Sequence, residues 1–142
     1  MIEIRPFDIK ELDTILELYV NNFKDLTADN IEYKKNKFKK DIMRFTKANI
    51  PGEILVAVEN NKIIGFASFI KKGHWYFGPF TVIPEYRGKN IGKLLLKSSL
   101  EIIKKEGGGK IRLTVQKNNQ TAIKIYENHN FKITSFIMEL DI

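Results

Sequence analysis

The stretch "PEYRGKNIGKLLL", residues 84–96, places two glycines, an asparagine and three basic residues directly before an apolar helical pattern. A glycine-rich turn that leads into a helix is typical of a phosphate site, because the first N–H groups of a helix are unpaired and its dipole is positive there. Gly88 and Gly92 let the backbone approach a ligand closely, since no Cβ intervenes. Taken alone, the stretch fits a plain solvated turn about as well.

The two best-known phosphate loops do not match residues 84–96. A Walker A loop needs four residues between its glycines and a Ser or Thr after its lysine. Here Gly88 and Gly92 enclose three residues, and Leu94 follows Lys93. A dinucleotide-binding fingerprint follows the first strand of a parallel β-α-β unit, whereas the strands before this stretch are antiparallel by pattern. What remains is an anion-binding nest of N–H groups at a helix N-terminus.

The residues before this stretch predict a short strand and two helices. Residues 2–7 alternate apolar and charged positions, as a strand does. Asp8 and Glu11 form a capping-box pattern before the first helix, and a second helix begins at Thr27 and ends before Pro51. The apolar face of the first helix follows a 3.6-residue spacing through Leu12, Ile15, Leu16, Tyr19 and Phe23.

Residues 53–83 change to the period of a β-sheet. Residues 53–60 and 63–71 predict an antiparallel hairpin with a tight turn at 61–62, and residues 74–83 predict a third strand. The Gly78-Pro79 pair cannot continue a normal ladder, because proline has no N–H to donate. A bulge or splay is therefore expected there, with a gap beside the next strand.

The downstream pattern predicts a helix over 91–106, a strand over 110–116 and a helix over 119–129. Residues 131–142 predict one or two closing strands. Three hairpin-joined strands followed by a β-α-β unit require a sheet that is antiparallel first and parallel at its end. The sequence therefore predicts a single α/β domain over residues 1–142, with helices on both faces of a mixed sheet.

The run from Phe80 to Phe131 closely resembles the GNAT superfamily of N-acetyltransferases. The family's acetyl-coenzyme A signature, R/Q-x-x-G-x-G/A, is matched through residues 87–92, with Asn90 where glycine is commonest. Asparagine is the residue other than glycine that best tolerates positive φ. The family's second pattern is matched by Asn119, Ala122, Tyr126 and Phe131, with Asn130 in place of the usual glycine. The predicted order of strands and helices is also the family's order.

The resemblance implies that acetyl-coenzyme A is the acetyl donor. No metal is expected, because the sequence has no cysteine and its two histidines are far apart. The pyrophosphate of acetyl-coenzyme A is expected on the N–H groups of residues 87–92, and its pantetheine arm along the strand at 80–82. The implied cofactor-binding residues are Phe80, Thr81, Val82, Arg87, Gly88, Lys89, Asn90, Ile91, Gly92, Lys93, Asn119 and Tyr126. A backbone N–H near Gly78-Pro79 could polarise the thioester carbonyl. For Asn119, the resemblance implies a cofactor contact, and helix capping is the alternative.

The family's reaction is direct attack of an amine on the thioester in a ternary complex, without a covalent enzyme intermediate. Tyr126 matches the family tyrosine beside the sulfur and is expected to act as the general acid; packing on its helix face is the alternative reading. The general base stays open between His74, Glu85 and a water relay, since residues 74–82 contain no carboxylate.

Composition limits the class of protein. The net charge of +7 favours anionic partners, although the dense lysines of residues 33–40 also fit a solvated helix face. The sequence has no cysteine, and its two histidines, His74 and His129, are far apart. It has no apolar run of signal-peptide or membrane-span length. We therefore expect a cytoplasmic monomer or homodimer that does not bind membranes.

The acceptor is expected to be a primary amine of a small molecule, a peptide or a protein N-terminus. The lysine-rich second helix disfavours polycations such as polyamines by charge repulsion. The alternative function is a non-catalytic coenzyme A-binding module that regulates or binds nucleic acid through its basic face. Nucleic acid is the less favoured partner, since no stretch combines aromatic and basic residues as single-strand binders do.

Overall fold

The computed structural model describes residues 1–23 and 27–142, with one five-stranded sheet in the order β1-β2-β3-β4-β5. The strands are β1 (Glu3–Pro6), β2 (Gly52–Glu59), β3 (Lys62–Lys72), β4 (His74–Val82) and β5 (Ile111–Arg112). The helices are α1 (Leu12–Val20), α2 (Ala28–Lys47), α3 (Ile91–Lys105) and α4 (Gln120–Asn128), with 3-10 turns η1 (Ile9–Glu11) and η2 (Pro84–Tyr86). Strands β1 to β4 pair antiparallel and β4 pairs with β5 in parallel, which confirms the predicted mixed sheet.

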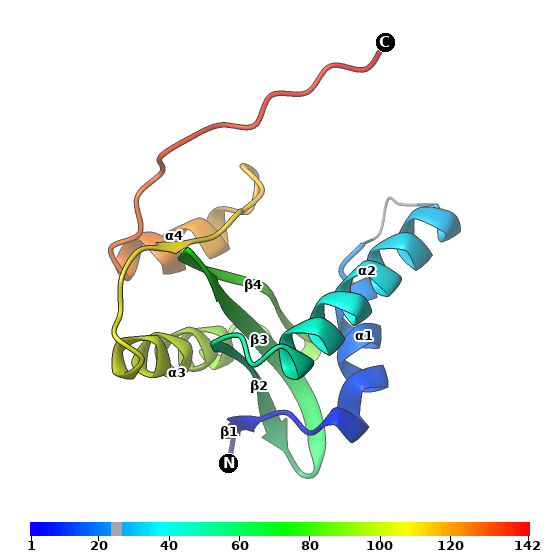
Figure 1. The fold of residues 1–142 in the computed structure, drawn as a ribbon, viewed down its shortest axis with the longest axis vertical. Coiled ribbons are helices and arrows are strands. Elements are labelled where there is room, and N and C mark those ends of the chain that lie inside the picture. Colours follow the sequence, from blue (N-terminus) through cyan, green and yellow to red (C-terminus); the bar gives the residue numbers. More distant parts are fainter. Residues whose placement is uncertain (24–26) are drawn as a thin grey trace.

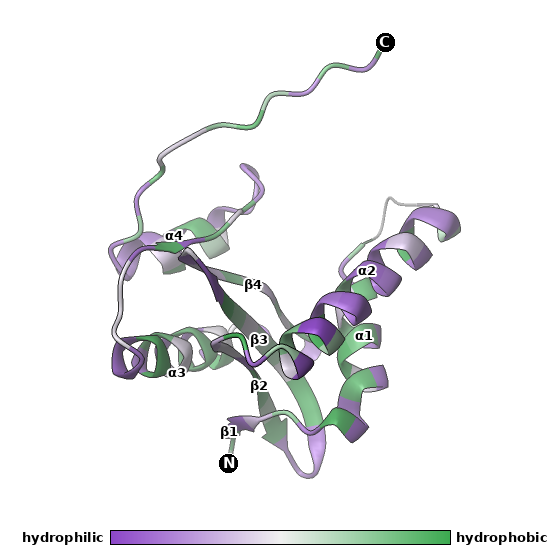
Figure 2. Ribbon diagram, in the orientation of Figure 1, coloured by the Kyte–Doolittle hydropathy of each residue, from purple (hydrophilic) through white to green (hydrophobic). Residues whose placement is uncertain are grey.

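Helices cover both faces of the sheet, with α1 and α2 on one side and α3 on the other (Figure 1). Residues 54–57 of β2 are all buried and alternate between the two cores. A strand that is buried on both faces reads as a continuous apolar run. On α2 the apolar side chains that reach the core include Phe38 and Ile42, while much of its remaining surface is hydrophilic (Figure 2).

The hairpin between β2 and β3 turns at Asn60 and Asn61, which both have positive φ, 51° and 63°. Two successive residues with positive φ define the turn type that matches the twist of paired strands. The predicted turn at residues 61–62 was therefore wrong by one position. Lys62 is the first residue of β3 instead, because asparagine adopts positive φ more readily than lysine.

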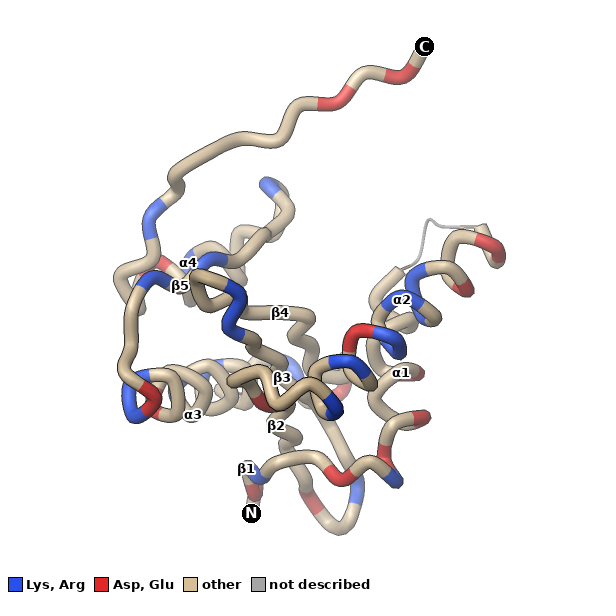
Figure 3. Tube along the Cα trace, viewed as in Figure 1, with Lys and Arg blue, Asp and Glu red and all other residues tan. Residues whose placement is uncertain are grey.

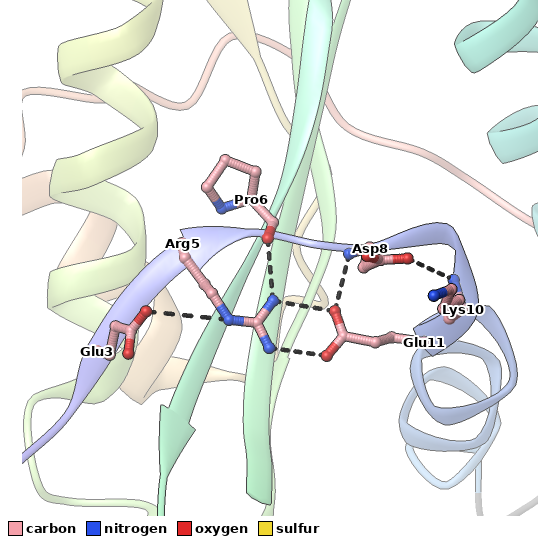
Figure 4. Close-up of polar contacts among 6 residues, drawn as sticks. All are labelled: Glu3, Arg5, Pro6, Asp8, Lys10 and Glu11. Atoms are coloured by element: carbon pink, nitrogen blue, oxygen red, sulfur yellow. Dashed lines mark hydrogen bonds and ion pairs between the residues drawn. The ribbon is translucent and has the colours of Figure 1, made fainter. Parts of the chain in front are cut away.

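The chain enters α1 through a compact polar cluster (Figure 4). Asp8 accepts a hydrogen bond from the Lys10 N–H at 2.9 Å, and Glu11 accepts one from the Asp8 N–H at 2.8 Å, so the capping box is confirmed. Arg5 donates to both carboxylate oxygens of Glu11, at 3.0 and 2.8 Å. The Arg5 hydrogen bonds hold the pKa of Glu11 below its ordinary value, and the cluster fixes β1 against the start of α1.

Strand β4 is irregular where the sequence predicts it. Ala67 opposes Phe80 and Phe69 opposes Phe77, so Gly78 and Pro79 together face one residue of β3, which is a bulge. The Ser68 hydroxyl donates to the Pro79 carbonyl at 2.8 Å. The bulge thus has a defined geometry, held from the neighbouring strand.

The C-terminal part of the chain differs from the prediction. Strand β5 has only two residues, not the seven of residues 110–116, because its ladder with β4 ends after Tyr76 pairs with Arg112. The closing strands predicted over residues 131–142 are wrong: no strand is formed there, and residues 132–142 are exposed. The strand-like pattern is present in that segment, but no neighbouring strand pairs with it.

Candidate active site

The turn between β4 and α3 has the conformation that its glycines and asparagine predict. Gly88 has φ of +79° and Asn90 has φ of +64°, the region that favours glycine and tolerates asparagine. Asn90 is the N-cap residue of α3. Its replacement of the usual glycine therefore leaves the turn intact.

Six consecutive amide groups of this turn have no acceptor within the described chain. The N–H groups of residues 88–93 make no hydrogen bond to another described residue, and the first bond of α3 runs from the Leu94 N–H to the Asn90 carbonyl at 3.1 Å. The side chains of Lys89 and Lys93 are exposed beside them. Free amides, a helix N-terminus and two ammonium groups are the groups with which proteins commonly bind an anion such as pyrophosphate.

The side chain of Arg87 contacts the end of strand β4 and does not point into the turn at residues 88–93. Its Nε donates to the Val82 carbonyl at 2.9 Å, so its side chain lies back along the end of β4. Lys89 in turn lies over the ring of Tyr86, with its Nζ 5.1 Å from the centroid. These two contacts hold the end of β4 and the turn after it together.

Gly92 has a packing role that the sequence alone did not predict. A Cβ added at Gly92 would lie 3.0 Å from Cζ of Phe80, closer than an ordinary van der Waals contact. Glycine thus lets the first turn of α3 approach the Phe80 ring, which itself packs on Phe77 at 5.4 Å between centroids. Apart from its two chain neighbours, no described residue comes within 4 Å of a Cβ built at Gly88, so it is the φ of +79° that favours glycine there.

One edge of β4 is open beyond Tyr76. From Phe77 to Val82 this strand pairs with β3 but not with β5, so its outer edge presents unpaired backbone groups. The side chains of Phe80 and Thr81 face opposite sides: Phe80 packs towards α3, and the Thr81 hydroxyl donates to Asn22 Oδ1 at 2.8 Å. The gap between β4 and the residues after β5 is the splay that the sequence predicts.

Tyr126 of α4 lies at this gap. Its ring packs edge-on against Phe77 at 6.4 Å and against Phe131 at 5.7 Å, and the residue is 8% exposed. Burial raises the pKa of Tyr126 to about 12. Among the described residues its hydroxyl has no hydrogen-bond partner, so both packing and a ligand contact are compatible with this position.

Asn119 caps α4, because its Oδ1 accepts from the Ala122 N–H at 3.2 Å. This contact supports the capping role that the sequence left beside the cofactor contact. His129 follows the same helix, and its Nδ1 lies 2.8 Å from the Ile125 carbonyl. The residues described contain no group of three or more His, Cys, Asp or Glu side chains that could hold a metal ion.

The candidate bases proposed from sequence lie far from the bulge. His74 is the first residue of β4, four positions before Gly78, which is about 13 Å along a strand. Glu85 lies beyond the other end of β4, in η2, and is exposed. Neither side chain is brought to Gly78 by the fold, and the choice among His74, Glu85 and a water relay stays a prediction.

A cavity of about 120 Å³ reaches the bulge from the α2 side of the sheet. Its lining includes Phe38, Asp41, Phe45, Glu53, Gly78 and Pro79. Burial raises the pKa of Glu53, whose Oε1 accepts from the Ile54 N–H at 3.1 Å. Sequence patterns did not single out Asp41 or Glu53, because neither belongs to a motif and both are distant in sequence from the bulge.

An open strand edge that leads to a turn with free amides, with a phenol at the opening, has the shape and chemistry to fit a long ligand with a phosphate head. The sequence model of the Acetyltransferase (GNAT) family matches residues 12–131. The chain therefore belongs to the GNAT acetyltransferase family. Among the described residues, no helix is both long enough and apolar enough to cross a membrane.

Individual proteins that resemble this chain are also named as N-acetyltransferases. The chain is 31% identical to a spermidine N(1)-acetyltransferase of Thermoplasma acidophilum, over 97% of this chain and 96% of the relative. It is 26% identical to N-alpha-acetyltransferase 30 of Schizosaccharomyces pombe, over 92% and 84% respectively. The crystal structure of the PaiA N-acetyltransferase of Thermoplasma acidophilum in complex with coenzyme A has a TM-score of 0.79 and 29% identity, covering 96% of this chain and 93% of that one.

Proposed function

We propose that this protein transfers the acetyl group of acetyl-coenzyme A to a primary amine by direct attack within a ternary complex. The observation that carries the proposal is the open edge of β4, which leads from the bulge to the six unpaired amides of residues 88–93. The coenzyme A complex of the Thermoplasma relative supports this choice of ligand.

The residues fit coenzyme A in two parts. Its pyrophosphate would accept hydrogen bonds from the amides of residues 88–93, with Lys89 and Lys93 neutralising charge. Its pantetheine arm, which has amide groups, would pair with the open backbone of residues 80–82 as an added strand does. Phe80, Thr81 and Val82 then act through their backbone, while Arg87 positions the strand end through the Val82 carbonyl.

Tyr126 would donate a hydrogen bond to the leaving sulfur. With a pKa of about 12 the phenol keeps its proton at neutral pH. Full transfer to a thiolate whose conjugate acid has a pKa of roughly 8.5 would be uphill by roughly 5 kcal/mol. Stabilisation of the developing thiolate by the intact O–H is therefore the main role, and the proton itself comes later from solvent.

The amine would approach from the opposite face, through the cavity beside Gly78 and Pro79. Glu53 lies two strands away from β4, about 10 Å across the sheet, so it does not reach the attacked carbonyl. It would instead bind a second cationic group of the acceptor. Asp41 adds a second carboxylate to the cavity.

A diamine or polyamine is therefore the first candidate acceptor, and the spermidine N(1)-acetyltransferase relative supports it. The repulsion expected from the lysines of α2 is reduced, because Lys39 and Lys40 line a neighbouring surface hollow and not this cavity, and of the basic residues of α2 only Arg44 lines both. A peptide N-terminus is the second candidate. Arg44 and Lys72 also line the cavity and would suit a carboxylate-bearing peptide, and the N-alpha-acetyltransferase relative supports this choice.

The test is acetyl transfer from acetyl-coenzyme A to a panel of amines that includes spermidine, a monoamine of the same length and acidic and neutral peptides. Release of the coenzyme A thiol and the mass of the product are measured. Spermidine as the best acceptor supports the polyamine proposal, and a peptide as the best acceptor selects the second candidate. Binding of coenzyme A without acetylation of any amine would favour the regulatory module instead. A cytoplasmic location stays a prediction.

A further inference from the structure

Ser68 is a buried polar residue in the middle of an apolar strand. Residues 64–69 of β3 are all buried, and Ser68, which is 7% exposed, is the one among them with a polar side chain. A buried hydroxyl lowers stability unless it forms a hydrogen bond, whereas an alanine at the same position has no such requirement. A role other than packing is therefore expected for this hydroxyl.

The hydroxyl of Ser68 contacts the backbone of the bulge in β4. It donates to the Pro79 carbonyl at 2.8 Å, and its neighbours Ala67 and Phe69 are the β3 residues between which the register shifts. Ser68 also lines the cavity on the α2 side of the sheet, together with Gly78 and Pro79. The side chain thus lies between the proposed acceptor cavity and the strand that would hold the donor.

This hydrogen bond orients the peptide group that joins Pro79 to Phe80. The bond between these two residues is trans, and in a planar trans peptide the C=O and N–H groups point in opposite directions. Because the Pro79 carbonyl points to β3, the Phe80 N–H points away from β3, towards the open edge of β4.

The ladder between β3 and β4 gives the same orientation. The Ile83 N–H donates to the Ile64 carbonyl at 2.9 Å, and Thr81 lies opposite Phe66 two residues along each strand. The backbone groups of an antiparallel strand alternate between its two edges. Those of Thr81 therefore face β3, and those of Phe80 face the open edge.

The middle of β3 and the whole of β4 carry no charged side chain. Lys62, Lys71 and Lys72 lie at the ends of β3, and β4 contains no Lys, Arg, Asp or Glu (Figure 3). These two strands therefore offer backbone N–H groups, rather than cations, to a carbonyl beside the bulge. Such donors stabilise a developing negative charge only when they already point at the position where it forms.

We propose that Ser68 is a positioning residue for acetyl transfer: its hydrogen bond to the Pro79 carbonyl aims the Phe80 N–H at the carbonyl oxygen of the bound thioester. This inference rests on the proposed function, because it needs the thioester to lie beside the bulge. The Phe80 carbonyl and the Val82 N–H lie on the same open edge and remain for the amide groups of the pantetheine arm. Ser68 acts through Pro79 and touches no reacting atom.

The first test needs no amine. Infrared difference spectra of bound acetyl-coenzyme A, isotope-labelled at its carbonyl, report how strongly the thioester C=O is polarised. In the wild type the C=O stretch is expected at a lower frequency than in free acetyl-coenzyme A. Ser68→Ala should return it towards the free value, and Ser68→Thr, which keeps a hydroxyl, should retain the wild-type frequency. An unshifted band in the wild type, or the wild-type shift in Ser68→Ala, would overturn the proposal.

Steady-state kinetics then separate positioning from substrate binding. Deletion of an oxyanion-hole donor lowers kcat by roughly 100- to 1,000-fold, and a donor that is present but no longer held should cost less. We therefore expect Ser68→Ala to lower kcat by roughly 10-fold, with the Kd for acetyl-coenzyme A and the KM for the amine within about twofold. Ser68→Thr should recover the lost rate. A raised KM for the amine with an unchanged kcat would place Ser68 in acceptor binding and contradict the proposal.

The matched control is Ser99→Ala on α3. It also removes a buried hydroxyl that donates to a backbone carbonyl, that of Leu95 at 2.7 Å, but it should leave both kcat and the C=O frequency unchanged. A Ser68→Ala variant that loses thermal stability as Ser99→Ala does, yet keeps the wild-type kcat and frequency, would limit the Ser68 hydroxyl to stabilising the fold and contradict the positioning role.

The outcomes distinguish this inference from the function on which it rests. A wild type that acetylates amines, with a Ser68→Ala variant equal to it in rate and spectrum, contradicts the positioning role alone. A wild type that binds acetyl-coenzyme A but acetylates no amine contradicts the proposed function, whereas a lowered C=O frequency that depends on Ser68 would still support the orientation of the Phe80 N–H. A wild type that does not bind acetyl-coenzyme A contradicts both.

Discussion

The proposed donor side and the proposed acceptor side of the site are built in different ways. On the donor side, the end of β4, the turn at residues 87–92 and the start of α3 follow one another without a break in the chain. On the acceptor side, the cavity is assembled from α2, β2, β3 and the bulge of β4. A site built from contiguous residues leaves a motif in the sequence, whereas a site built from distant elements does not.

The largest expected effect tests the junction of the two sides, at Tyr126. Replacement with Phe removes the proposed hydrogen bond to the leaving sulfur but keeps the ring contacts with Phe77 and Phe131. We expect kcat to fall by roughly 100-fold, while the Kd for acetyl-coenzyme A in calorimetry stays within about twofold. Tyr76→Phe, on the exposed side of β4, is the control. An unchanged kcat in the Tyr126 variant would assign that residue to packing alone.

In contrast to Tyr126, the turn at residues 87–92 should affect the binding of coenzyme A more than the rate of the reaction. The double variant Lys89→Ala/Lys93→Ala removes two exposed cations beside the free amides, so the Kd for coenzyme A should rise by about tenfold and its salt dependence should weaken. The matched control removes Lys104 and Lys105 from the far end of the same helix. Equal affinity losses in both variants would mean that the net charge of +7, rather than this turn, attracts the cofactor.

On the acceptor side, Glu53→Gln should raise KM for spermidine by about tenfold and leave KM for a monoamine unchanged. The physical reason is that a second ammonium group loses its carboxylate partner. Glu59→Gln, at the other end of β2, is the control. Equal changes for both amines would show that Glu53 does not contact the far end of the acceptor.

The buried phenol also predicts a dependence of stability on pH. The unfolded chain ionises Tyr126 near pH 10, whereas the folded chain retains that proton up to about pH 12. The unfolded state therefore binds fewer protons in this window, and the free energy of unfolding falls as pH rises through it. Tyr126→Phe should remove about 1 kcal/mol of the loss between pH 9 and pH 11, measured by urea unfolding. If the free energy of unfolding falls equally in wild type and variant over this pH range, the phenol of Tyr126 is exposed to water.

The smallest effect lies far from both sides, at the entry to α1. Glu11→Gln weakens the contact with Arg5, and because both side chains are partly exposed the free energy of unfolding should fall by at most about 1 kcal/mol at pH 7. The pKa of Glu11 is lowered in the fold, so this contribution is present above the carboxyl's ordinary pKa and is lost as pH falls through the folded value. A difference between wild type and variant that persists at pH 2 would point to the capping geometry instead of the charge.

The sequence predicted most of the fold and the local conformation of the turn before α3 well, because local chemistry determines them. The positive φ of Asn90, the capping by Asp8 and Asn119, and the bulge at Gly78-Pro79 all depend on residues within a few positions of one another. Sequence reasoning failed at residues 131–142, where a strand pattern has no partner strand among the described residues. It also missed Glu53, whose burial and altered pKa arise from the packing of elements that are distant in sequence.

The most direct test of direct transfer between the two sides is a matrix of initial rates at varied acetyl-coenzyme A and varied amine. If both ligands must occupy the gap beside β4 together, double-reciprocal plots should intersect, and no acetylated protein should appear by mass spectrometry before amine is added. Parallel lines with an acetylated enzyme would contradict attack within a ternary complex.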